Sequence, residues 1–123
     1  MDFRLSEAKS LLAEGKWDGA YYLAGYAVEF AFKVRIIAQL MASESFPDKK
    51  LIDDFYKHNL MELRKTAGLE LVMQQDDTVA AQWNIVKDWS EQTRYQIGKT
   101  EADAVSLVNA IESEVLPWIK ARW

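Results

Sequence analysis

The chain has 123 residues, a formal net charge of −4 and no cysteine. This length is enough for one hydrophobic core and too short for two ordinary domains, so we expect a single domain over residues 1–123. The acidic balance argues against a protein that coats nucleic acid by bulk positive charge. The absence of cysteine excludes disulfides, thiolate zinc sites and cysteine nucleophiles.

The first helix is expected over about residues 6–14. Leu5, Ala8, Leu11 and Leu12 recur at the spacing of one helical face, and Gly15 supplies a stop. The segment carries charges of both signs and has no apolar core of the signal-peptide kind behind it. We therefore expect a protein that stays in the cytoplasm.

A second, central helix is expected over about residues 19–42, with Asp18 as its N-cap. Its apolar stretch is long enough to cross a bilayer. Glu29, Lys33 and Arg35 lie in the inner half of this stretch, where charges are costly in hydrocarbon. The pattern predicts the buried helix of a helical bundle, with no membrane association.

The middle of the chain is expected to be a loop followed by short helices. Residues 43–50 contain Pro47 and Asp48, which favour a turn. Residues 51–56 are expected to form one helical turn. Asn59 is predicted to cap the N-terminus of a further short helix, and Gly68 is predicted to end that helix.

Two longer helices are expected in the last third of the chain. Asp76 and Asp77 offer caps and negative charge for a helix that runs to about residue 93. Thr100 and Asp103 have the spacing of a capping box at the start of the last helix, which Pro117 should bend or end. No segment alternates as a strand does. The fold class is therefore all-α, an up-and-down bundle of four to five helices.

Three stretches of the chain resemble the HEPN family. Residues 21–33 read YYLAGYAVEFAFK and resemble the family's signature helix. Residues 58–63, HNLMEL, resemble its short H-x-L-x-x-L element, and residues 89–95, WSEQTRY, resemble the end of the helix before the final one. The resemblance implies a helical bundle that is usually homodimeric, is often paired with a nucleotidyltransferase and is an RNA-cutting toxin in many members.

The RNA-cutting members of that family carry an Arg followed four to six residues later by a His. The matching Arg here is Arg94, whereas Gly98, Lys99 and Thr100 stand where the His would fall. This departure removes the residue best suited to proton transfer near neutral pH.

Glu29 and Lys33 lie one helical turn apart on the most apolar helix, so their charges need partners. We favour the interpretation that they form a polar brace between helices together with Arg94. In the alternative, Lys33 and Arg94 bind a phosphate in a cleft beside Glu29. Tyr95 is then the best candidate for stacking on a base. His58 is a candidate for a displaced general base, although a lone His at a helix start is more often a hydrogen-bonded or surface residue.

Three functions remain open from the sequence. The first is a non-catalytic, dimeric binding or regulatory module for a nucleotidyltransferase partner, a nucleotide or RNA. The second is a metal-independent endoribonuclease in which Arg94 stabilises the phosphorane and Tyr95 or His58 supplies acid–base chemistry. The third is a dimerising scaffold without a ligand, consistent with five Trp and five Tyr in a small chain. No metal and no cofactor are expected.

Overall fold

The computed structural model describes residues 2–44 and 46–123, and all regular structure in this part of the chain is helical. The predicted all-α class is confirmed, although the described residues divide into more and shorter helices than four or five. Most are short segments that follow the central helix. The elements in chain order are α1 (Asp2–Ala13), α2 (Trp17–Ser43), α3 (Lys49–Phe55), α4 (Leu60–Thr66), α5 (Glu70–Gln74), α6 (Asp77–Val86), η1 (Glu91–Tyr95), α7 (Glu101–Ala110), η2 (Ile111–Val115) and α8 (Leu116–Lys120).

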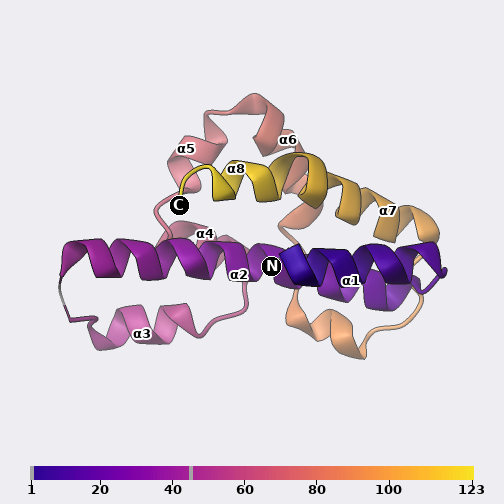
Figure 1. Cartoon of the computed structure of the whole chain (residues 1–123), viewed down its shortest axis with the longest axis horizontal. Helices are drawn as coiled ribbons and strands as arrows, with labels where there is room; N and C mark the ends of the chain where they lie inside the picture. The colour runs from indigo at the N-terminus through magenta and orange to yellow at the C-terminus, as the bar shows by residue number, and fades with distance from the viewer. Residues whose placement is uncertain (1, 45) are drawn as a thin grey trace.

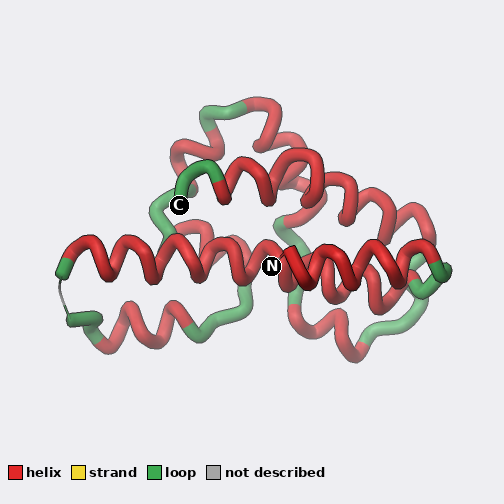
Figure 2. The backbone as a smooth tube through the Cα atoms, in the orientation of Figure 1, coloured by secondary structure: helices red, strands yellow, loops and turns green. Residues whose placement is uncertain are grey.

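The long helix α2 is the axis of the molecule, and α1, α4, η1, α7, η2 and α8 pack directly on it (Figure 1). α1 lies along its N-terminal half, α7 and α8 run along one edge, and α3 and η1 lie along the opposite edge (Figures 1 and 2). Its buried face is rich in small side chains, which let neighbouring helices approach closely; Ala20, Ala24, Ala27 and Ala31 have no exposed surface. Within the described residues, no helix combines the length and the apolar character needed to span a bilayer.

Several predicted helix ends are confirmed. Gly15 follows α1 with a positive φ of 75°, a conformation that favours glycine. The Asn59 side chain accepts a hydrogen bond from the Glu62 backbone N–H at 3.1 Å. Thr100 and Asp103 form the predicted capping box at the start of α7.

Asp18 is not the N-cap of α2, because the helix already begins at Trp17. Its carboxylate instead accepts hydrogen bonds from the backbone N–H groups of Gly98 and Lys99, at 3.3 and 2.8 Å. Asp18 therefore ties the start of α2 to the segment between η1 and α7, a contact across 80 residues of sequence.

The helix expected from Asp76 to about residue 93 is shorter, because α6 ends at Val86. Because the chain leaves the helix after Val86, the Trp89 side chain can pack against α2. The indole of Trp89 is 2% exposed, and its Nε1–H donates to the Tyr21 carbonyl at 3.1 Å. Burial of such a large aromatic group outweighs the loss of a last helical turn. The chain then forms the separate 3₁₀ helix η1.

Pro117 neither ends the last helix nor interrupts its path. The preceding turn, η2, is a π-helix in which the Leu116 N–H donates to the Ile111 carbonyl, five residues back. Pro117 has no N–H, and its ring would crowd the carbonyl of Ser113 in a regular α-helix. The wider π turn relieves this conflict and lets α7, η2 and α8 continue along α2.

We predict that Gly25→Ala lowers the stability of the protein. A Cβ atom at Gly25 would lie 2.0 to 2.2 Å from three indole atoms of Trp89, so the ring would have to move. Overpacking of this kind costs about 1–3 kcal/mol. In a domain of this size the melting temperature should fall by roughly 4 °C or more.

The matched control is Gly19→Ala in the same helix, where the added Cβ meets the flexible end of Leu11 at 3.0 Å. Both changes replace a helical glycine by alanine, so the main difference is the group that the new Cβ meets: the end of the Leu11 side chain or the buried Trp89 ring. Equal melting temperatures for the two variants would contradict the importance of this contact.

Candidate functional site

The most deeply buried charge is Glu29, which lies on α2 with 1% of its surface exposed. One carboxylate oxygen, Oε1, lies 2.8 Å from Nδ1 of His58. The other, Oε2, lies 3.6 Å from Nζ of Lys33. Both oxygens of the buried carboxylate therefore have a partner, as a buried charge requires.

His58 connects this carboxylate to η1. It lies just before α4, and its Nε2 is 3.3 Å from Oε2 of Glu91. Both ring nitrogens therefore face carboxylates. The imidazolium form donates a hydrogen bond to both, whereas the neutral ring can donate to only one. We call Glu29, His58 and Glu91 the carboxylate–histidine bridge, because these three residues join α2, the start of α4 and η1.

Glu29 and Lys33 thus pair as the sequence predicted, but both lie on α2, and the exposed Arg94 does not join them. The ammonium group of Lys33 pairs with Glu29 and lies 5.4 Å from the centre of the Phe55 ring, with 14% of its side chain exposed. Arg94 is exposed, and His58 takes the place expected for it. The prediction that Lys33 and Arg94 bind one phosphate together also loses support, because the Lys33 ammonium already pairs with Glu29.

Arg94 and Tyr95 lie together at the exposed end of η1. The guanidinium carbon of Arg94 is 5.8 Å from the centre of the Tyr95 ring, and Tyr95 is 76% exposed. Ile97, two residues later, is also exposed. A cation, an aromatic ring and an apolar side chain thus face solvent within four residues of sequence.

This exposed segment is held firmly at both ends. Before it, Trp89 is buried against Gly25, and Glu91 contacts His58. After it, Asp18 accepts the backbone N–H groups of Gly98 and Lys99. Exposed Arg and Tyr side chains on a segment anchored in this way are typical of a binding loop presented by a rigid scaffold.

An aromatic cluster of Tyr22, Tyr26 and Trp89 lies between α2 and the start of η1. The rings of Tyr22 and Tyr26 meet edge to face at 5.0 Å, and both contact Trp89. Hydrogen bonding to Tyr22 and burial raise the pKa of Tyr26 well above that of an ordinary tyrosine, and the negative charges of Glu29 and Glu91 add to the effect. Tyr22 and Tyr26 are therefore packing residues of the fold.

Glu91 is the member of the bridge that the sequence did not indicate. It falls inside the region predicted as a long helix, and nothing in its spacing relates it to His58. Its role depends on the end of α6 at Val86, which in turn follows from the packing of Trp89 on Gly25.

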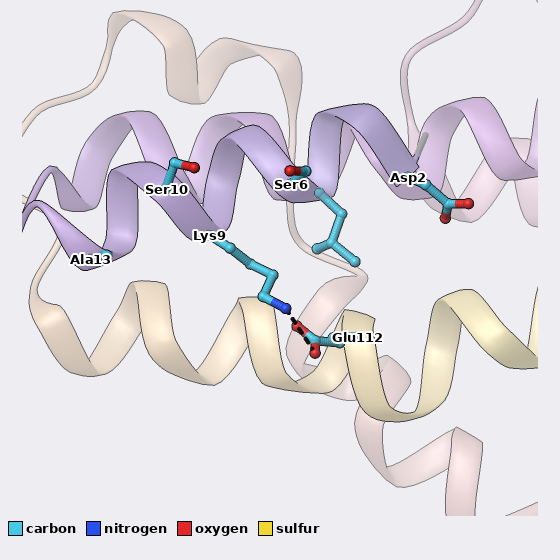
Figure 3. Close-up of a pocket in the computed structure, with 7 residues that line it drawn as sticks. Asp2, Ser6, Lys9, Ser10, Ala13 and Glu112 are labelled. Carbon is cyan, nitrogen blue, oxygen red and sulfur yellow. Dashed lines mark hydrogen bonds and ion pairs between the residues drawn. The ribbon is translucent and has the colours of Figure 1, made fainter.

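A separate hollow of about 480 Å³ lies between α1 and the start of η2, away from these residues. The Lys9 ammonium crosses it to reach Glu112 at 3.1 Å (Figure 3). Among residues 2–44 and 46–123, no group of three His, Asp or Glu side chains is arranged to hold a metal ion.

No protein-family model matches the chain, and searches of curated proteins and of solved structures give no match.

We predict that Glu29→Ala destabilises the protein by about 3 kcal/mol, because it leaves Lys33 without the partner of a buried pair. Replacing Glu29 and Lys33 together by apolar residues should cost less than the single change. Chemical denaturation of the three proteins measures both differences.

The matched control is Glu112→Ala, which removes the exposed partner of Lys9 and should cost less than about 1 kcal/mol. If Glu29→Ala proved as mild as this control, the carboxylate would not be a structural brace.

Proposed function

We propose that this chain is a HEPN-like binding module that takes a phosphate-bearing ligand, a nucleotide or RNA, at the exposed end of η1. The observation that carries the proposal is the placement of Arg94 and Tyr95. Both side chains face solvent on a segment that is anchored before and after them.

The chemistry of the two residues suits such a ligand. The guanidinium of Arg94 can donate two parallel hydrogen bonds to one phosphate. The exposed ring of Tyr95 offers a face on which a base can stack. Lys99 follows in the same segment, with its ammonium 4.3 Å from the centre of the Tyr21 ring. Lys33 and Glu29 serve the site indirectly, because they hold His58 and through it η1.

We predict that a nucleotide such as UMP raises the melting temperature of the protein, because a ligand that binds the native state stabilises it. Arg94→Ala should abolish the shift without changing the melting temperature of the free protein, since Arg94 is exposed. The control is Arg4→Ala on α1, where Arg4 pairs with Glu7 and lies outside the site. A shift that survives Arg94→Ala would place the ligand elsewhere.

The proposal includes a homodimer, which can also dock a nucleotidyltransferase partner. Val34, Ile37 and Met41 follow one another along α2 at the spacing of a helix–helix seam, and the last two are exposed. A second copy of the chain offers the same seam and can cover it. Sedimentation should show a dimer at micromolar concentration and a monomer for Met41→Lys. A wild-type monomer would contradict this part of the proposal.

The second candidate function is a metal-independent endoribonuclease. The observation that favours it is the carboxylate–histidine bridge. A buried carboxylate that holds Nδ1 of a histidine is the arrangement that orients a general base. Nε2 of His58 faces Glu91, so Glu91 must give way before Nε2 can accept a proton from an attacking hydroxyl. Arg94 would then stabilise the charge that develops on the phosphate.

If the protein cleaves RNA, we predict that His58→Gln and Arg94→Ala each reduce the rate by about a hundredfold or more, the usual contribution of an acid–base group or an electrostatic stabiliser. The measurement is the rate of cleavage of a labelled RNA by the purified variants. Intact RNA after incubation with the wild type supports the binding module. Cleavage that persists in both variants comes from another site or another protein.

A further inference from the structure

A polar pocket of about 320 Å³ lies between α3 and α4. Its lining carries three lysines, two carboxylates and one hydroxyl group: Lys50, Asp54, Lys57, Glu62, Lys65 and Thr66. We call it the lysine pocket. A gathering of three lysines around one hollow stands out in a chain with a net charge of −4.

The two carboxylates hold two of the lysines in place. Asp54 lies 3.0 Å from the ammonium of Lys50 and 3.1 Å from that of Lys57, and Glu62 lies 3.6 Å from Lys57. Hydrogen bonds from Lys50 and Lys57 lower the pKa of Asp54, and the hydrogen bond to Asp54 raises the pKa of Lys57. Lys57 therefore stays charged throughout the neutral pH range.

Lys65 is the cation of the pocket that is free to meet a ligand. It is exposed, and within residues 2–44 and 46–123 it has no carboxylate partner. Thr66, beside it in the lining, adds a hydroxyl group that can donate to a phosphate oxygen. An anion in the pocket would thus meet Lys65 as an unpaired positive charge, with the ammonium of Lys57 close by between Asp54 and Glu62.

The lysine pocket is linked to the η1 site by direct contacts. Lys57 precedes His58 in the chain, His58 touches Glu91, and Arg94 lies one 3₁₀ turn after Glu91. Chain geometry along this path puts Lys57 and Arg94 within about 20 Å of each other. Both α3 and η1 lie on the same edge of α2 (Figure 1).

We propose that the lysine pocket is a second phosphate subsite, and that the ligand of the η1 site is a single-stranded polynucleotide that reaches both. This inference rests on the proposed binding at Arg94. A mononucleotide contacts one subsite only. A strand of about ten nucleotides, a length within the roughly 4–16 nucleotides that one OB fold covers, spans the two, with one phosphate at Arg94 and others at Lys57 and Lys65.

The test compares UMP with a single-stranded oligouridylate of about ten nucleotides, a length that covers both subsites. The oligonucleotide should bind at least tenfold more tightly. Its affinity should fall with salt, with a slope of about −2 in log–log form, since each neutralised phosphate of a single strand contributes about −0.7. Lys65→Ala should reduce the slope by about 0.7 and leave UMP binding unchanged.

The control is Lys9→Ala on α1, which removes a lysine that lines neither subsite and pairs with Glu112, and it should leave the slope unchanged. If the oligonucleotide binds no more tightly than UMP, or if Lys9→Ala lowers the slope as much as Lys65→Ala, the second subsite is wrong. UMP binding that depends on Arg94 would still support the η1 site in that case. Failure of both ligands to bind would overturn the proposed function as well.

Discussion

The buried carboxylate of Glu29 is the constraint on which the surroundings of the site depend. It lies in the most apolar helix of the chain, where an unpaired charge costs several kcal/mol or more. Lys33 and His58 meet this requirement from two different elements. Because His58 lies between α3 and α4, the need for a partner fixes the position of that connection against α2. The second ring nitrogen of His58, Nε2, contacts the carboxylate of Glu91 and so connects η1 to the same group of residues.

A second constraint acts from the other side of η1. Gly25 leaves room for the Trp89 indole on the surface of α2, and no other residue type fits there without displacing the ring. Burial of Trp89 ends α6 early and turns the chain so that Thr93 packs inward while Arg94 and Tyr95 face solvent. The exposure of these two side chains is thus a consequence of packing in α2. This is why the proposed binding site depends on residues that do not touch the ligand.

The helical class, the central helix and several helix ends could be predicted because each has a local cause. Gly15, Asn59 and the pair Thr100 and Asp103 act on residues within one turn, so their sequence signals are sufficient. The burial of Glu29 and its pairing with Lys33 follow from helical spacing for the same reason.

The early end of α6 and the bridge to Glu91 could not be predicted, because their causes are distant in sequence. The partner of Trp89 is Gly25, and the partner of His58 is on η1. Asp18 was expected to cap its own helix and instead holds a segment 80 residues away. Arg94 was predicted to join Glu29 and Lys33 on the basis of its charge alone. In the structure His58 is a partner of Glu29, and Arg94 is exposed.

The most direct test of this account is amide hydrogen exchange in His58→Ala, because the central claim is that the bridge from Glu29 holds η1 in place. The 3₁₀ helix is short, and its backbone hydrogen bonds, such as that from the Gln96 N–H to the Thr93 carbonyl, open easily without tertiary support. We predict faster exchange over residues 91–96 in the variant and unchanged exchange in α7. Unchanged exchange over residues 91–96 would contradict the account.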